Sequence, residues 1–83
     1  MPADRDAVRL RNLLYAATAG NVRLWVHLEY VQRWATMTDD ACQAAARRAA
    51  ENGWIAVIGR PDVHTVRMTA EGCRLARQRR QRA

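Results

Sequence analysis

Residues 52–72 constrain the fold most strongly, because they predict a single short β-hairpin between two helices. In a strand, side chains 55 and 57 face one way and side chains 56 and 58 the other, and the alternation returns at Val66 and Met68. The residues Gly-Arg-Pro-Asp supply the turn between the two strands. The chain thus devotes about a quarter of its length to one hairpin, and we expect the hairpin tip, residues 60–64, to be free to reach a partner.

The size of the chain allows only one thin hydrophobic core. Its 83 residues form a single domain, and a chain this short buries little more than ~60% of its unfolded surface. Hydrophobic residues make up 49% of the sequence, yet no apolar run approaches the ~18 residues of a membrane span. The charged N-terminus lacks the apolar stretch of a secretory signal. We therefore expect a cytoplasmic protein.

Positive charge is concentrated toward the C-terminus. The net charge is +6, and all 14 basic residues are arginines. Six of them lie in residues 67–83 beside one acid, Glu71, which gives +5, whereas residues 1–66 carry eight arginines against seven acids. An arginine cluster can follow a phosphate backbone and release its counterions, which favours nucleic-acid contact without sequence preference. A solubilising chain end, or a contact for RNA or an acidic protein, also fits this cluster. The absence of serine excludes a serine hydrolase.

Two helices are predicted in the N-terminal half of the chain. The first is capped by Asp4 or Asp6 and ends at Gly20, placed at C′. Its apolar face has helical spacing and consists of Leu10, Leu13, Leu14 and Ala17. The second helix is predicted over residues 24–35, where alternating and helical patterns overlap in the first turn.

Two further helices flank the hairpin. Thr38 caps the third helix, residues 39–51, and the acids at its start favour the positive end of the helix dipole. The inward positions of this helix are Cys42, Ala45, Ala46 and Ala49. Gly53 closes the third helix, and Thr69 caps a last helix that begins at Ala70 and fades into the basic end.

Several short motifs occur in order along these elements. They are "LEYVQRWA" in the second helix, Met37 as the apolar residue before Thr38, "AAENGWI" at the end of the third helix, and "VRMTAEG", which is similar to a strand-to-helix "LTxxG" motif. Together they resemble the winged helix-turn-helix DNA-binding domain, in a small stand-alone version with a core like that of the MarR and PadR families. The resemblance implies a mainly α fold with a small β-hairpin, with residues 1–76 as the winged helix domain and residues 77–83 as a basic tail.

The resemblance also implies a binding site for double-stranded DNA, with the third helix in the major groove and the wing and tail on the backbone. The implied base-reading residues are Asp40, Gln43, Ala44 and Arg47. The resemblance, which spans roughly residues 8–76, implies backbone contacts at Arg48, Arg60, His64 and Arg67, and the arginine cluster adds Arg77, Arg79, Arg80 and Arg82. The chain would then be nucleoid-associated, as a small transcriptional regulator or a mobile-element accessory factor of a bacterium or phage, with a homodimer as an option.

The charge of the third helix favours two alternatives. Two arginines stand against Asp39, Asp40 and Glu51, which gives −1 where phosphates would lie. A winged-helix protein-interaction module without DNA readout, or an RNA binder driven by the tail, also fits this pattern. A continuous positive face would favour DNA, whereas an exposed apolar patch on the first or third helix would favour a protein partner.

The remaining chemistry-bearing residues predict no catalytic or metal site. The cysteines and histidines are too few and too scattered for metal-ligand spacing: Cys42, Cys73, His27 and His64. We expect both thiols to be buried, and we expect Trp34 and Trp54 to fill the core of a chain that has no phenylalanine. We expect neither enzymatic activity nor a cofactor, and no small-molecule ligand is evident.

Overall fold

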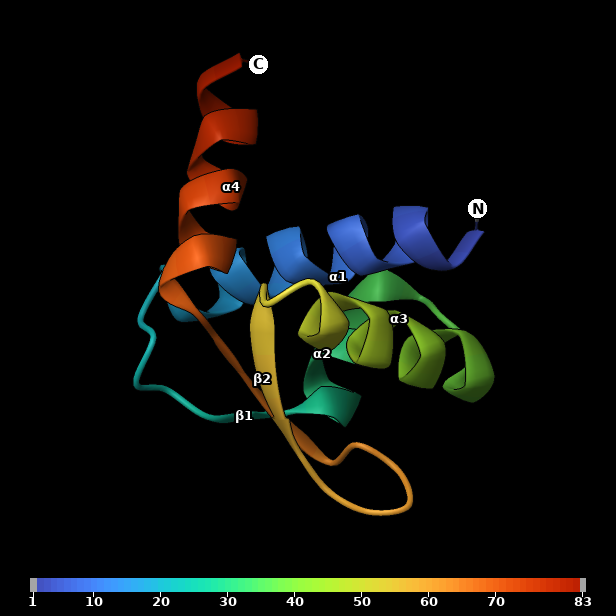
Figure 1. Ribbon diagram of the computed structural model, residues 1–83. Coiled ribbons are helices and arrows are strands. Elements are labelled where there is room, and N and C mark those ends of the chain that lie inside the picture. Colours follow the sequence, from blue (N-terminus) through green and yellow to red (C-terminus); the bar gives the residue numbers. More distant parts are fainter. Residues whose placement is uncertain (1, 83) are drawn as a thin grey trace.

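Four helices and a small sheet make up the structure, a computed structural model that describes residues 2–82, with side chains described for residues 4–78 (Figure 1). In chain order the elements are α1 (Pro2–Thr18), β1 (Val26–His27), α2 (Leu28–Ala35), α3 (Asp39–Glu51), β2 (Ile55–Ile58), β3 (Thr65–Met68) and α4 (Ala70–Arg82). Three helices precede the β2–β3 hairpin and one follows it. This is the order of a winged helix-turn-helix fold, so the predicted fold class is confirmed.

The sheet is antiparallel with the order β1-β3-β2, which makes β3 its central strand. Val66 of β3 is paired with Val57 on one side and with Val26 on the other. Strand β1 was not predicted, and the predicted start of the second helix at Leu24 is wrong, because α2 begins only at Leu28. This segment follows its alternating pattern and not its helical one, because pairing with β3 gives β1 hydrogen bonds. Leu24, the first apolar residue of the helical pattern, remains exposed.

Helix α1 begins earlier than predicted, and its buried face is shifted. It starts at Pro2 and not after a cap at Asp4 or Asp6, since proline suits the first helical position, where no N–H is needed. Ala17, predicted to face the core, is exposed. The buried residues of α1 are Ala7, Leu10, Arg11, Leu14 and Thr18. The face that packs on the rest of the molecule therefore extends to Ala7 and excludes Ala17.

The C-terminal end of α1 is a Schellman motif. The backbone N–H of Gly20 donates to the carbonyl of Tyr15 at 3.1 Å, and that of Ala19 donates to the carbonyl of Ala16 at 3.4 Å. Ala19, with φ of 52°, occupies the left-handed C′ position, and Gly20 follows at C″ with φ of 75°. The predicted assignment of Gly20 to C′ is therefore wrong by one residue.

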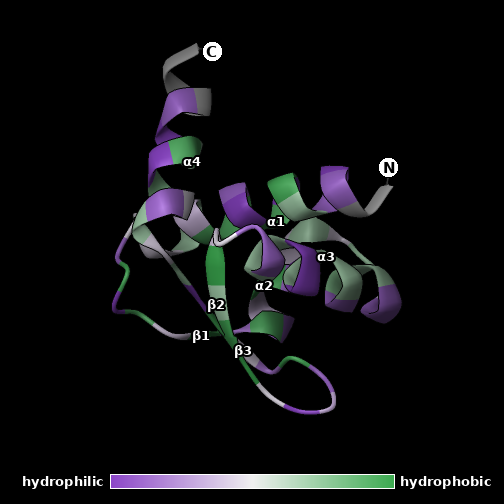
Figure 2. Cartoon of the chain, in the orientation of Figure 1, coloured by the Kyte–Doolittle hydropathy of each residue, from purple (hydrophilic) through white to green (hydrophobic). Residues whose placement is uncertain are grey.

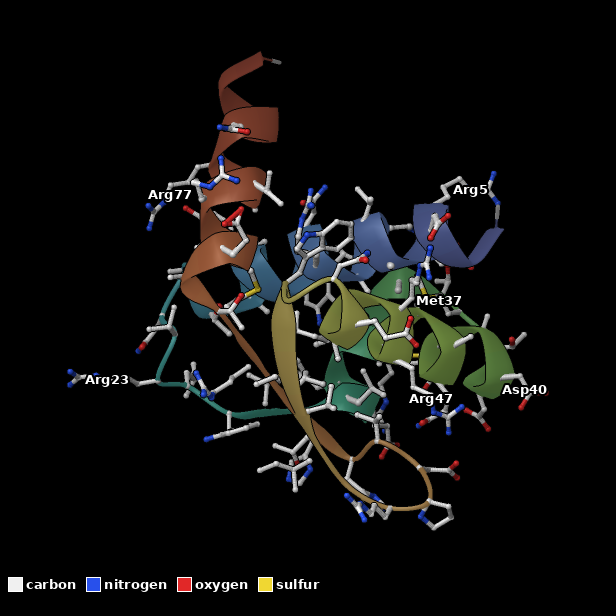
Figure 3. The ribbon with its side chains drawn as sticks, viewed as in Figure 1. Arg5, Arg23, Met37, Asp40, Arg47 and Arg77 are labelled. Carbon is white, nitrogen blue, oxygen red and sulfur yellow. The ribbon has the colours of Figure 1, made fainter. Side chains whose placement is uncertain are left out.

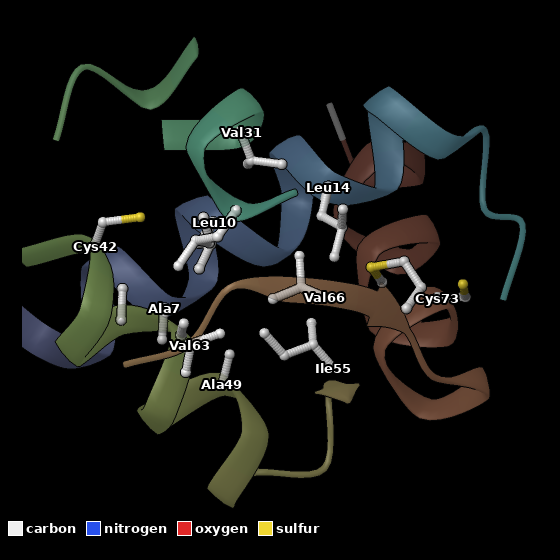
Figure 4. Packing of buried hydrophobic residues seen from close by; sticks show 14 residues of the cluster. Ala7, Leu10, Leu14, Val31, Cys42, Ala49, Ile55, Val63, Val66 and Cys73 are labelled. Carbon is white, nitrogen blue, oxygen red and sulfur yellow. The ribbon is translucent and has the colours of Figure 1, made fainter. Parts of the chain in front are cut away.

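Helix α3 lies against α1 through small side chains. Thr38 caps it as predicted, with the Thr38 hydroxyl oxygen accepting a hydrogen bond from the Ala41 N–H at 3.2 Å. The buried residues of α3 are the predicted ones: Cys42, Ala45, Ala46 and Ala49. Such small residues permit a short distance between the helix axes. The same core includes Leu10, Leu14 and Val66 (Figure 4).

The tryptophans fill the core less than predicted. The prediction for Trp34 is wrong, because its side chain is 67% exposed on α2. The buried stripe of α2 consists of Leu28, Val31 and Ala35, and Trp34 lies outside it. Trp54 is half-buried and packs against the core, with the Arg11 guanidinium 4.6 Å from its ring centroid. Aliphatic and small side chains thus fill most of the interior.

Helix α4 is anchored to the turn that precedes β2. The Thr69 hydroxyl oxygen accepts from the Gly72 N–H at 3.0 Å and donates its own hydrogen to the Gly53 carbonyl at 2.6 Å. Thr69 therefore caps α4 as predicted. A Cβ atom at Gly72 would overlap the carbonyl of Trp54. The "VRMTAEG" motif thus needs its glycine so that α4 can begin against the backbone of residue 54.

Helix α4 projects away from the other elements and is mainly hydrophilic (Figures 1 and 2). It continues as a helix to Arg82, so the boundary predicted between residues 76 and 77 falls inside a helix. Across the described part of the chain, none of the helices combines the length and the apolar character that crossing a membrane requires.

Replacing Gly72 by alanine is expected to lower the free energy of unfolding by about 1–3 kcal/mol, the usual cost of overpacking. A decrease in the free energy of unfolding is informative, because alanine normally stabilises a helix interior by about 1 kcal/mol relative to glycine. Urea unfolding followed by circular dichroism measures the change. Gly53→Ala is the control, since a Cβ there meets nothing within 4 Å and costs only the left-handed φ of 76°. A Gly72→Ala variant as stable as the parent chain would contradict the close approach.

Candidate nucleic-acid interface

The wing loop, residues 59–64 between β2 and β3, is attached to helix α3. The Gln43 side chain donates from Nε2 to the Val63 carbonyl at 2.9 Å and accepts at Oε1 from the Val63 N–H at 2.8 Å. The Val63 side chain is 6% exposed and belongs to the core. The prediction that the hairpin tip is free is therefore wrong at Val63, because this residue packs inward and Gln43 satisfies both of its backbone groups.

Arg47, a predicted base-reading residue, also lies beside the wing loop. Its Nη2 donates to the carbonyl of Pro61 at 3.4 Å and lies 3.5 Å from a carboxylate oxygen of Asp62. The side chains of Arg47 and Asp62 are about half and two-thirds exposed. An ion pair this long and this exposed contributes little stability. Arg47 can therefore exchange Asp62 for another anion at small cost.

The other predicted residues of α3 carry no surplus of positive charge. Arg48 forms ion pairs with Asp4 at 2.6 Å and with Glu51 at 3.4 Å, and the hydrogen bond that it donates to Asp4 is the main reason that the pKa of this guanidinium is raised. Asp40 and Ala44 are exposed, and Asp40 lies at the outer end of α3 (Figure 3). A phosphate approaching this helix would therefore meet carboxylates as well as guanidiniums.

A groove of about 610 Å³ separates α2 from α3 and the wing loop. Glu29 and Arg33 on its α2 side form an ion pair at 3.1 Å. Gln32, also on α2, donates to the Asp39 carboxylate of α3 at 2.6 Å. His64, a predicted backbone contact, lines the groove and is exposed. Charges of both signs line this groove, so it offers no strong attraction for a phosphate backbone.

Three arginines without a carboxylate partner among the described residues lie away from α3. We define the arginine edge as Arg23, Arg67 and Arg77, which come from the α1–β1 loop, β3 and α4. Arg23 and Arg77 lie on the side of the molecule opposite Asp40 (Figure 3). Arg67 and Arg77 are among the predicted backbone contacts, whereas Arg23 is not, because its position in a short loop between two elements is its only signal in the sequence.

The arginine edge is held by neutral oxygen atoms and an aromatic ring. Arg67 donates from Nη1 to the Val22 carbonyl at 3.2 Å, and its guanidinium lies 5.0 Å from the ring centroid of Trp25. Arg77 donates from Nε to the Tyr15 hydroxyl at 3.3 Å. These contacts orient the guanidiniums of Arg67 and Arg77 without neutralising them. None of the three arginines of the edge has a carboxylate partner within residues 4–78.

The remaining predicted backbone contacts lie at the two ends of this region. Arg60 is exposed in the wing loop and forms no ion pair with any described side chain. The side chains of Arg79, Arg80 and Arg82 lie outside the described residues, although the backbone of α4 runs through them. Their predicted contact with DNA stays a prediction.

Both cysteines are buried, as predicted, and neither is part of a disulfide. Burial, and to a smaller extent the charge of Asp39, raises the pKa of the Cys42 thiol from 9.0 to about 11. Cys73 donates to the Gly20 carbonyl at 3.4 Å. Among the described residues, histidine, cysteine and carboxylate side chains form no group of three that could hold a metal ion.

The chain matches none of the protein-family models, none of the curated proteins and none of the solved structures with which it was compared. Its likeness to winged helix-turn-helix domains therefore rests on the order and arrangement of its own elements. Because a fold alone does not confer function, the roles predicted for the individual site residues stay predictions.

Replacing Gln43 by alanine is expected to detach the wing loop from α3. The Val63 N–H would lose its acceptor in a buried site, which costs about 1–3 kcal/mol, and its amide hydrogen would exchange faster in NMR measurements. Gln43→Glu is the matched control, because a carboxylate still accepts from the Val63 N–H but cannot donate to the Val63 carbonyl. Unchanged protection of Val63 in the alanine variant would refute the attachment.

The thiol of Cys42 is expected to make the protein less stable at alkaline pH. Because its folded pKa of about 11 exceeds the ordinary 9.0, the unfolded chain loses this proton first. The protonated thiol therefore adds on the order of 2 kcal/mol to the free energy of unfolding relative to high pH. This contribution is complete below pH 9 and is lost as the pH rises to about 11. Urea unfolding across this range should show a step in the parent chain that Cys42→Ala lacks. Identical pH dependence in both proteins would contradict the prediction.

Proposed function

We propose that this protein binds double-stranded DNA mainly through its phosphate backbone, as a small winged-helix regulator or mobile-element accessory factor with a MarR- or PadR-like core. The observation that carries the proposal is the charge of the arginine edge, which is not compensated by any described carboxylate. Each guanidinium that neutralises a phosphate releases a counterion and adds affinity. Helix α4 extends this basic region toward Arg79, Arg80 and Arg82.

Helix α3 has a smaller part in the proposal. Arg47 can leave its long ion pair with Asp62 and reach a guanine or a phosphate. Gln43 already uses both ends of its amide on Val63, so it is available to a base only if the wing loop detaches. We therefore propose backbone binding with weak sequence preference, in which Arg47, Asp40 and Ala44 are the residues that could face bases.

A second candidate function is a protein-interaction module that does not bind DNA. The observation in its favour is the charge on and beside α3. Its two arginines, Arg47 and Arg48, are ion-paired with Asp62, Asp4 and Glu51, and Asp39 and Asp40 add two carboxylates at the start of the helix. Such a surface repels a polyanion. The same binding experiment separates the two candidates and the RNA alternative.

The arginine edge can be tested with matched pairs of charge-neutralising substitutions. Arg23→Gln with Arg77→Gln removes two charges that have no carboxylate partner. Arg33→Gln with Arg74→Gln removes two charges that are already paired with Glu29 and Glu71. In duplex-DNA titrations over a salt series, the first double variant should bind more weakly and show a salt slope smaller by about 2. The second should remain closer to the parent chain.

The tail contribution requires a truncation that spares the core. A chain ending at Gln78 removes Arg79, Arg80 and Arg82 but keeps the buried residues Cys73 and Ala76. If both double variants lost duplex-DNA affinity equally, the arginine edge would have no special part in binding. Absence of duplex binding by the full chain at low salt would overturn DNA binding and favour the protein-interaction module. Tighter binding to single-stranded RNA than to duplex DNA would favour the RNA alternative.

A further inference from the structure

An apolar cleft of about 160 Å³ lies between helices α1 and α2. The cleft is lined by Leu13, Ala16, Ala17, Tyr30, Val31 and Trp34. None of these side chains carries a charge at neutral pH. The cleft uses neither the arginine edge nor the face of α3, so the proposed function does not account for it.

The cleft combines a large aromatic ridge with a floor of small side chains. Tyr30 and Trp34 on α2 are 51% and 67% exposed, and their ring centroids lie 6.4 Å apart at an interplanar angle of 53°. Ala16 and Ala17 on α1 are also exposed. A thin core would gain from burying two aromatic side chains, yet this fold presents them beside a shallow hollow. Such a contiguous apolar surface indicates an interaction site.

We propose that this cleft is the interface of a two-fold symmetric homodimer, in which Trp34 of each copy packs on Ala16 and Ala17 of the other. A two-fold interface must be self-complementary, so that each contact occurs twice. A ridge and a matching hollow side by side on one surface fulfil this condition.

Charge also favours a second copy as the occupant. Two chains of net charge +6 repel each other unless they meet where positive charge is absent or balanced. The cleft lining is uncharged, and the nearest charges on α2, Glu29 and Arg33, already form an ion pair at 3.1 Å. On α1 the exposed Arg9 lies one turn before Leu13 and has no described ion pair, so a two-fold related copy would meet this one unbalanced charge beside an otherwise uncharged lining.

The exposed area sets the expected strength of the dimer. Aromatic side chains bury ~150–250 Å² each, so the exposed parts of Tyr30 and Trp34 supply roughly a third of the ~800 Å² per partner of a standard interface. Flanking parts of α1 and α2 must provide the rest. We therefore expect a weak dimer with a micromolar dissociation constant.

Sedimentation of the full chain from about 1 μM to about 500 μM, a range that brackets micromolar dissociation constants, tests this directly. The mean mass should rise from 9.4 kDa toward twice that value. Trp34→Ala should stay monomeric and keep the parent melting temperature, because the side chain is mostly exposed. Trp25→Ala is the control, since Trp25 is also exposed but does not line the cleft.

Ala17→Arg provides a second variant, because it adds a charge to the floor without removing an aromatic ring. It should also abolish association. In NMR spectra, the indole N–H signal of Trp34 should shift with concentration while that of Trp25 stays constant. A parent chain that is monomeric at the highest concentration overturns the proposal and leaves the cleft to a different protein. A dimer that survives both Trp34→Ala and Ala17→Arg overturns it as well. These measurements contain no nucleic acid, so their outcome is independent of the proposed function.

Discussion

The packing of α3 on α1 through small side chains is the contact on which the rest of the structure depends. Cys42, Ala45, Ala46 and Ala49 add little volume between the helices, so a core of a few aliphatic residues is enough to fill the interior. Strand β2 follows α3 after a short turn, and Thr69 fixes the start of α4 to the same turn. The placement of α3 thus determines where the hairpin and α4 can lie.

The wing loop follows from the same placement. With α3 close to the core, Val63 can reach the interior while Gln43 satisfies its backbone groups. A winged-helix protein that reads bases through its third helix keeps the outward side chains of that helix available. In this chain the wing loop occupies two of them, Gln43 and Arg47. The arginine edge, in contrast, carries three positive charges without a described carboxylate partner.

Local patterns in the sequence predicted the elements whose energetics are local. The α3 cap and buried face, the hairpin and the Thr69 cap all depend on spacing within a few residues, and the structure has them as predicted. Strand β1 could not be predicted in the same way, since two residues become a strand only because β3, some forty positions later, pairs with them.

The misplaced site residues have the same origin. The size of Trp34 favours a place in the core, but the stripe of α2 that faces inward runs through Leu28, Val31 and Ala35 and leaves Trp34 outside. Gln43 was assigned to a base from its outward position on α3, but a loop twenty residues away along the chain reaches its amide. Arg23 belongs to the arginine edge only through the fold, because nothing in its immediate sequence relates it to Arg77.

Magnitudes decide how much sequence preference α3 can supply. A bidentate contact between a glutamine and an adenine discriminates by about 1–3 kcal/mol. To make it, Gln43 must release Val63, which leaves a buried N–H without its acceptor at a cost of about 1–3 kcal/mol. The two quantities cancel within their range, so Gln43 gains no net free energy from reading a base while the wing loop is in place. Arg47 loses only a long and exposed ion pair, and any sequence preference of this helix must therefore come chiefly from Arg47.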